Sequence, residues 1–267
     1  MKFKIDHDYH IHSGLSTCSG CAEQNPQSIL QYAKENGLSR ICLTDHYWDS
    51  AVPGASDWYA PQNFEHIASA KPLPQADGVS FYFGCETDMD RHKTLGIPTE
   101  RFGDFNFVII PTTHLHMDGF TISLDDIGSN ERRAALWIER FDRLLDADLP
   151  FHKIGVAHLA CKLINKISRA DYLATLDLIP TAEMERLFAK AAERGCGIEL
   201  NGSDMRFEEN ETKTVLRMFR IAKYQGCKFY YGSDAHLPTS FSGRIPATER
   251  AIELLGLQEC DKFHFEA

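Results

Sequence analysis

The sequence predicts an α/β fold, a distorted, TIM-like (β/α)7 barrel of parallel strands. Three observations support it. Short β-branched runs alternate with longer amphipathic stretches, which is typical of parallel strands joined by right-handed crossovers. The 267 residues, 43% hydrophobic and 11% aromatic, can bury the core of a single domain over residues 1–267. Almost every polar candidate residue falls at the carboxyl end of a predicted strand, and a barrel brings those ends to one rim.

Seven stretches are predicted as strands and four as helices. An open, doubly wound sheet has the same periodicity, but it would scatter the polar residues too widely to share ligands. Gly37 is a stop signal for the first helix, and Thr181 with Glu183 is a start signal for the third. The strands are expected at 5–10, 40–44, 79–86, 105–110, 153–158, 197–201 and 228–232, and the helices at 25–36, 130–147, 181–194 and 211–225.

Three connections are unusually long, over residues 47–78, 87–103 and 115–129. Long connections in a compact domain are usually binding loops or lids. We expect all three to overhang the rim that carries the polar residues.

The charge balance restricts the partners. With 38 acidic and 28 basic residues the net charge is -10, which repels the backbone of long nucleic acids and favours a small, phosphorylated substrate. No apolar run approaches the ~20 residues of a membrane helix. The first residues carry no apolar region resembling a secretion signal, so the expected location is the cytoplasm.

The eight cysteines do not suggest a disulfide framework in a chain of this size. Cys18 and Cys21 form a lone Cys-x-x-Cys pair, which two loop thiols explain as well as a redox or ligand role. Cys18 is the better ligand candidate because it closely follows His12. Buried free thiols are expected at Cys42, Cys85, Cys161, Cys196 and Cys227.

Histidines and acids stand at the ends of the predicted strands. His10 and His12 alternate on the first strand, so both imidazoles can bind one metal, although such a pair alone is more often two ordinary half-buried side chains. Glu86 ends an apolar run, where an uncompensated carboxylate is costly. Many such groups at one end of a barrel would repel one another unless cations were bound among them. The other members are Asp45, which is also a candidate helix cap, His46, His114, His116, His158, Asp234 and His236.

These motifs resemble the PHP superfamily, named for polymerase and histidinol phosphatase. The resemblance covers residues 8–236 and is carried by residues 8–13 (DYHIHS), 43–46 (LTDH), 84–86 (GCE) and 233–236 (SDAH), with His114 and His158 between them. It implies a distorted barrel of seven βα units, two or three divalent ions, often zinc, manganese or iron, and hydrolysis of phosphate esters.

The resemblance also implies a ligand set. Cys18 stands where other members place a His or Asp; its soft thiolate would favour zinc, or the third site is weak or empty. His116 is an alternative to His114. Position by position, the first metal would be held by His10, His12, Glu86 and Asp234, the second by Glu86, His114 and His158, and the third by His46, His236 and Cys18.

Such ions would drive the chemistry. Two divalent cations ~3.5 to 4 Å apart lower the pKa of a shared water toward ~7, so a metal-bound hydroxide attacks phosphorus. Glu86 would set the metal spacing, and Asp234 would take the proton of the water or pass it to the leaving group. His236 or His46 would act as general acid if the third metal is absent. Asp45 is expected to orient an imidazole rather than to bind metal.

A phosphate dianion also needs cationic partners. Arg244, expected in a loop near the rim, is the first candidate for a bidentate clamp, and Lys162 is the second. Plain surface charges explain either residue as well. Asn201 is expected to face the mouth together with Glu199 and to bind substrate or cap the following turn.

The leading hypothesis is therefore a metal-dependent phosphoesterase, acting on a small phosphate monoester such as histidinol phosphate. A phosphodiesterase that trims nucleotides, or a hydrolase of another bond, would use the same ions. A non-catalytic metal-binding module and, more distantly, a redox protein built on Cys18 and Cys21 complete the alternatives.

Overall fold

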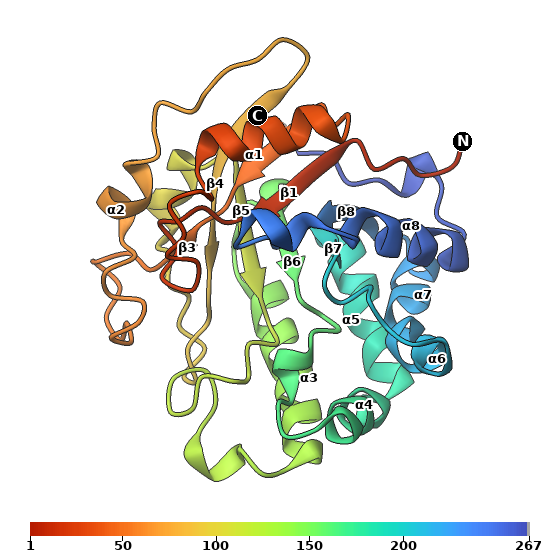
Figure 1. Ribbon diagram of the computed structural model, residues 1–267. Coiled ribbons are helices and arrows are strands. Elements are labelled where there is room, and N and C mark those ends of the chain that lie inside the picture. The colour runs from red at the N-terminus through yellow and green to blue at the C-terminus, as the bar shows by residue number, and fades with distance from the viewer. Residues whose placement is uncertain (266–267) are drawn as a thin grey trace.

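The computed structural model describes residues 1–265, and its core is a nearly closed barrel of parallel strands (Figure 1). The strands follow one another in the order β1, β2, β4, β5, β6, β7, β8, and the short β3 (His46–Tyr47) pairs with β4 off this path. All seven predicted strands are present, with their ends shifted by at most a few residues. Their bounds are β1 His7–Ile11, β2 Arg40–Leu43, β4 Ser80–Thr87, β5 Phe107–Pro111, β6 Ile154–Ala157, β7 Gly197–Asn201 and β8 Lys228–Gly232.

The barrel closes where β1 lies beside β8, a contact that we call the seam. In the described chain the seam has isolated backbone hydrogen bonds rather than a regular ladder. Side chains supply further bonds: the amide of Tyr231 donates to His7 Nε2 over 2.9 Å, and the amide of Ser233 donates to Asp8 Oδ1 over 2.8 Å. Side-chain acceptors therefore supplement the few backbone hydrogen bonds at the seam.

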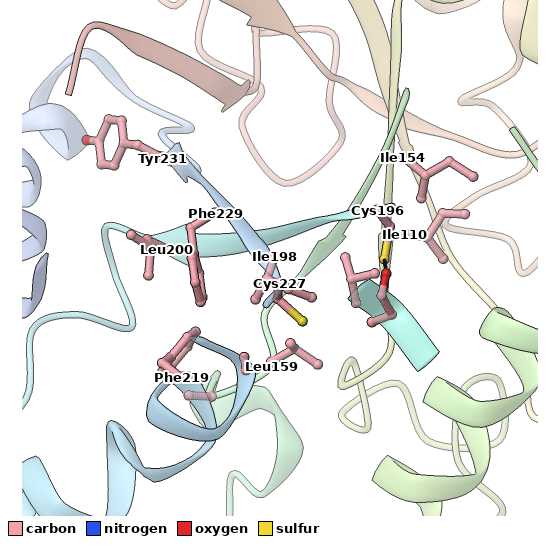
Figure 2. Packing of buried hydrophobic residues seen from close by; sticks show 14 of the residues in the cluster. Ile110, Ile154, Leu159, Cys196, Ile198, Leu200, Phe219, Cys227, Phe229 and Tyr231 are labelled. Atoms are coloured by element: carbon pink, nitrogen blue, oxygen red, sulfur yellow. Dashed lines mark hydrogen bonds between the residues drawn. The ribbon is translucent and has the colours of Figure 1, made fainter. Parts of the chain in front are cut away.

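Alternation along the strands separates two layers of side chains. Figure 2 shows the outer layer, in which Ile198 and Leu200 of β7 and Phe229 and Tyr231 of β8 pack among other buried apolar side chains. The residues between them point into the barrel. This alternation places Glu199 and Tyr230 on the inner face.

Aromatic rings fill the lower part of the barrel interior. Tyr9, Phe107 and Tyr230 come from three strands, and Phe263 and Phe265 of the final segment join them. Phe107 stacks on Phe265 with ring centroids 4.9 Å apart. This packing forms a solid floor beneath the rim.

Small residues make room for these rings. A methyl group at Gly155 would lie 2.5 Å from Phe107 Cζ and would overlap the hydroxyl of Tyr230. A methyl group at Gly197 would lie 2.8 Å from the ring of Phe263. Glycine at these two positions is thus required by close approach.

Helices surround the barrel, and each predicted helix is present in some form. The helices are α1 Pro26–Glu35, α2 Phe64–Ala68, α3 Asn130–Asp146, α4 Arg169–Leu178, α5 Thr181–Arg194, α6 Thr212–Val215, α7 Arg217–Tyr224 and α8 Arg244–Leu255. Asn25 caps α1 in a capping box with Ser28, and Gly37 follows its end with a φ of 65°.

Three expectations about the connecting segments are corrected. The predicted helix over 211–225 is divided into α6 and α7, with Leu216 between them. The sequence did not predict α4 or α8, and Arg244 begins α8 rather than lying in a loop. Its guanidinium donates to the carbonyl oxygen of Ser233, which fixes it beside the last motif.

The long connections carry some structure of their own. The segment 47–78 contains α2, and the segment 115–129 contains the 3₁₀ turn η2 (Leu124–Asp126). The segment between β2 and β5 lies on the side of the barrel away from α4 to α7 (Figure 1). Within residues 1–265, none of the helices has the length and apolar character needed to cross a membrane.

The cysteine prediction is confirmed for the five buried positions. Cys42, Cys85, Cys161, Cys196 and Cys227 are free and buried. The thiol of Cys227 donates to the carbonyl oxygen of Phe188 over 3.2 Å, so it is held against α5. These residues act as small core side chains.

Candidate active site

The predicted ligands gather at the carboxyl ends of the strands. His10 lies on β1, Glu86 lies on β4, and His158 and Asp234 directly follow β6 and β8. The backbones of His158 and Asp234 have φ values of 62° and 54°, which are rare for residues with a side chain. Strain of this kind is concentrated at functional sites, and here it turns both side chains into the rim.

Glu86 occupies the middle of the cluster. Its Oε2 is 3.4 Å from His10 Nε2, 3.2 Å from His12 Nε2 and 3.1 Å from His46 Nδ1. Its Oε1 is 3.4 Å from His158 Nε2 and 3.9 Å from His114 Nε2. Each carboxylate oxygen therefore faces a different group of imidazoles, as a carboxylate that bridges two cations would.

Asp234 borders the same space from the other side. Its Oδ1 is 3.4 Å from His12 Nε2, 3.6 Å from His10 Nε2 and 3.5 Å from His236 Nδ1. Its Oδ2 is 3.9 Å from His158 Nε2. Asp234 and Glu86 thus enclose a small volume between them.

Several buried atoms in the cluster have no hydrogen-bond partner in the described chain. These are both oxygens of Glu86 and Nδ1 of His46. The Nε2 atoms of His10 and His12 lie 3.0 Å apart and point to the same place. Buried polar groups are normally satisfied, so these atoms fit cation ligands better than hydrogen-bonding groups.

The donor atoms also meet the spacing that a metal requires. Three groups of donors lie within 4.8 Å of one another, and all consist of nitrogen and carboxylate oxygen. This donor chemistry suits zinc, manganese or iron. The groups are His10 with His12 and Asp234, His10 with Glu86 and His158, and His12 with His46 and His236.

Electrostatics favour cation binding. Burial opposes charge on Glu86, but His46 and His10 hold the pKa of Glu86 well below its usual range. Burial also opposes charge on His10, but Glu199, Glu86 and Asp234 raise the pKa of His10 to about 10. The cluster therefore contains ionised carboxylates whose charge is balanced by protons that divalent cations can replace.

His46 and His236 behave differently. Burial lowers the pKa of His46 well below the ordinary value, and burial together with His12 lowers the pKa of His236 to about 4. Burial thus disfavours the protonated form of both imidazoles. A neutral imidazole suits a metal ligand better than a proton donor.

Behind the ligands stands a layer of partners that the sequence did not identify as such. Glu199 Oε1 lies 2.6 Å from His10 Nδ1, and Asp88 Oδ2 lies 2.9 Å from His114 Nδ1. A carboxylate in this position keeps the proton on Nδ1 and leaves Nε2 free for a cation. The alternation of inward residues on β7 was a usable signal for Glu199, whereas Asp88 and His114 follow two different strands, β4 and β5, and their pairing has no local signal.

The expected role of Asp45 is met indirectly. Asp45 accepts hydrogen bonds from the Ser13 and Ser16 hydroxyls over 2.7 and 2.6 Å. The Ser16 hydroxyl lies 3.0 Å from His12 Nδ1, so Asp45 reaches that imidazole through Ser16.

Cys18 and His116 lie at the margin of the cluster. Cys18 is exposed, and although it lines the cavity beside His46, its sulfur does not join any of the donor groups of the described residues. His116 lines the same cavity, and burial beside His114 lowers its pKa to about 3. His114 contacts Glu86 and is the better placed of the two histidines.

A fourth donor group was not anticipated. His158, Cys161 and Asp204 offer donors within 4.8 Å of one another. Asn201 is buried, and its Nδ2 lies 3.5 Å from His158 Nδ1. Its Oδ1 accepts hydrogen bonds from the backbone amides of Ser203 and Asp204. Asn201 thus caps the turn after β7, which was one of its two expected roles.

Two cavities open onto the cluster, and both are lined by Asp234 and Leu163. The first, of about 490 Å³, we call the aromatic cavity, because segments 47–78 and 115–129 line it with Trp58, Tyr59, Met117 and Phe120. The second, of about 730 Å³, we call the cationic cavity. Its basic residues are Lys162, Lys166, Arg169 and Arg206, and Asp204 and Glu208 also line it.

The predicted substrate residues differ in their placement. Lys162 is exposed and lines the cationic cavity. Arg244 lines neither the aromatic nor the cationic cavity, and its guanidinium already contacts the backbone of Ser233.

Comparison with protein families matches residues 8–236 to the PHP domain. Two curated proteins described as probable phosphatases are similar over most of the chain. The protein of Caldicellulosiruptor saccharolyticus is 21% identical, over 93% of this chain and 87% of that protein. The protein of Caldicellulosiruptor bescii is 22% identical, over 93% of this chain and 86% of that protein.

A solved structure is similar as well. It is histidinol phosphate phosphatase from Lactococcus lactis, in complex with zinc, L-histidinol and phosphate, with a TM-score of 0.63 and 19% identity, covering 97% of this chain and 98% of that chain. At this identity the likeness shows the barrel fold.

Proposed function

The chain belongs to the PHP family, and on that premise we propose that it is a metal-dependent phosphatase that hydrolyses a small phosphate monoester. The descriptions of the two curated relatives and of the Lactococcus enzyme support phosphatase activity. Histidinol phosphate is the named candidate substrate, because the structurally similar enzyme was solved with histidinol and phosphate.

The observation that carries the proposal is the position of Glu86. Its two buried oxygens lack hydrogen-bond partners in the described chain and face two separate groups of imidazoles. A carboxylate in this state is costly without cations. Two cations bridged by one carboxylate are the arrangement that phosphoester hydrolysis uses.

We assign the ligands as the resemblance implied. Bound divalent ions supply Lewis acidity and lower the pKa of a water molecule toward ~7. Zinc suits the imidazole-rich donor set best, with manganese or iron as alternatives. The proposed sites are His10, His12, Glu86 and Asp234 for the first ion, Glu86, His114 and His158 for the second, and His46 and His236 for a third, with Cys18 at the margin of that third site.

Asp234 is the proposed proton acceptor. Burial opposes its ionisation, but His10 and His158 hold its pKa well below the ordinary value, so its carboxylate is ionised at neutral pH. Asp234 borders both cavities, so either of its oxygens can receive a proton from an attacking water and return it to the leaving oxygen. Glu86 and His236 hold the geometry around it.

We propose that the cationic cavity binds the phosphate oxygens that the metal ions do not coordinate. Lys162, Lys166 and Arg206 line it and form no ion pair within residues 1–265, whereas Arg169 is already paired with Glu211. We therefore rank Lys162 above Arg244 as a substrate contact. Arg244 would act by holding the Ser233 backbone next to Asp234.

Metal analysis combined with hydrolysis of a panel of phosphate monoesters and diesters tests the proposal. Asp234→Asn and His12→Ala should lose bound metal and activity together while staying folded. Asp77→Asn and His152→Ala, at exposed positions, are matched controls that should keep both. Full activity after chelation, or in His12→Ala, would contradict the proposal, and a preference for diesters would replace the monoesterase with a phosphodiesterase.

Four statements stay predictions of the sequence. They are the single domain over residues 1–267, the cytoplasmic location, the exclusion of long nucleic acid as partner, and the number of bound ions.

A further inference from the structure

The aromatic cavity lies directly beside the proposed reaction centre. Glu86, His114, His158 and Asp234 form one wall of it, and the two long segments form the opposite wall. Its volume of about 490 Å³ falls within the range of small-ligand sites. When the phosphorus of an ester is at the metal ligands, the alcohol portion can extend into this cavity.

Aromatic rings of the opposite wall hold one another in place. The ring of Trp58 is 4.9 Å from that of His46 at 68° and 4.7 Å from that of Tyr59 at 89°. Tyr59 and Phe120 lie 5.5 Å apart. The Tyr59 hydroxyl lies 3.4 Å from Asp88, so the wall is tied to the partner of His114. Trp58 and Phe120 are only half-buried, which leaves ring surface for a ligand.

The charges around the cavity restrict what it accepts. Among residues 1–265, no lysine or arginine lines it, in contrast to the cationic cavity. Apart from the proposed metal ligands, its charged residue is Asp118, which is exposed and therefore offers a cation only a weak, screened contact. An anionic group would have no partner there, whereas the ammonium group of an amino alcohol such as histidinol would have Asp118.

One polar atom of the wall awaits a partner. Nδ1 of His116 is buried and has no hydrogen-bond partner within the described chain. The His116 ring lines the cavity, so a rotation of this ring would be needed to present the nitrogen to a bound ligand.

We propose that the aromatic cavity binds the alcohol portion of the substrate and selects phosphate esters whose alcohol carries an uncharged planar ring. This proposal rests on the proposed function, which places the phosphorus of the ester at the metal ligands. Offset or edge-to-face contacts with Trp58 and Phe120 would hold the ring, as they do between aromatic side chains. The substrate class is thereby narrower than small phosphate monoesters in general.

Binding of phosphonates, which cannot be hydrolysed, tests the cavity independently of turnover. The metal-loaded protein should bind benzylphosphonate about tenfold more tightly than butylphosphonate or 4-carboxybenzylphosphonate in isothermal titration calorimetry. Trp58→Ala and Phe120→Ala should abolish this preference. Trp58→Phe should retain most of it, and Tyr224→Ala, at an aromatic residue that is 87% exposed, should retain all of it.

Hydrolysis separates the two proposals. The value of kcat/KM for benzyl phosphate should exceed that for butyl phosphate by a similar factor, and Trp58→Ala should remove the difference. Equal affinity for the three phosphonates, or a preference that survives both alanine variants, would overturn the ring-selecting cavity. Tight, ring-selective binding without hydrolysis of any ester would support the cavity and contradict the proposed phosphatase.

Discussion

Replacement of Glu199 by glutamine tests whether the layer behind the ligands controls metal binding. Glu199 is buried and accepts three contacts, from His10 Nδ1 at 2.6 Å, from the His158 amide at 3.0 Å and from the Asn201 side-chain amide at 3.2 Å. A carboxylate accepts all three. A glutamine has one oxygen and one donating NH₂ group, so at least one donor in this layer must then face another donor.

The expected cost follows from these contacts. Removal of a carboxylate behind a metal-bound histidine typically lowers metal affinity by about 10- to 100-fold, or roughly 1.4 to 2.8 kcal/mol. The mismatched donor adds about 1 to 3 kcal/mol to the loss of folding stability, because a buried donor is left unsatisfied. We therefore expect Glu199→Gln to weaken both metal binding and the fold.

Two measurements check this expectation. Competition with a chromophoric chelator measures metal affinity, and urea unfolding of the metal-free protein measures stability. Glu209→Gln, at an exposed carboxylate in the segment after β7, is the control and should change neither. If folded Glu199→Gln binds metal as tightly as the parent protein, Glu199 does not set the proton position on His10 and the reasoning is refuted.

Four further predictions concern the protonation of His10 and the packing of the aromatic floor. The carboxylates raise the pKa of His10 to about 10, so a metal ion that binds His10 below pH 10 must displace its proton. With one proton displaced, metal affinity should rise about tenfold per pH unit. A metal affinity that does not change with pH in chelator competition would contradict this. The raised pKa also means that the contribution of His10 to metal-free stability is complete below its unfolded pKa of about 6.5 and is lost as pH rises through about 10. Gly155→Ala should lower the free energy of unfolding by about 1 to 3 kcal/mol in urea. Gly103→Ala is the control and should not change it, because the space around the Gly103 Cβ position is open. Equal stabilities of the two variants would mean that the aromatic rings inside the barrel shift to accept the added methyl group. Phe265→Ala should cost about 3 to 5 kcal/mol, since the ring is 1% exposed and stacks on Phe107, and a thermal melt unchanged from the parent would show that the final segment does not seal the barrel.

The barrel and the rim were predictable because local signals were strong. Each strand is a short apolar run, and most candidate ligands directly follow such a run, as His158 follows Ile154–Ala157. Parallel strands joined by helices leave few ways to arrange such runs, and a shared rim satisfies buried Glu86. The convergence of Glu86 and Asp234 on the same imidazoles agrees with that expectation.

The features that escaped prediction depend on contacts between distant segments. The partnership of Asp88 with His114 spans 26 residues, and that of Glu199 with His10 spans 189 residues. No periodic pattern encodes such pairs. The aromatic wall arises because Trp58 and Phe120 come from two irregular segments that meet above the rim. Arg244 was misplaced because α8 begins without a side-chain cap, so its sequence carried no start signal.

The seam between β1 and β8 gives metal binding a mechanical consequence. His10 and His12 belong to the first strand and its extension, whereas Asp234 follows the last strand. An ion held by all three would link the two strands across the seam, where the described chain has isolated backbone hydrogen bonds rather than a regular ladder. Metal binding should therefore reduce local opening of the barrel at the seam. Hydrogen exchange at the amides of Tyr231 and Ser233 should then slow more than elsewhere in the sheet.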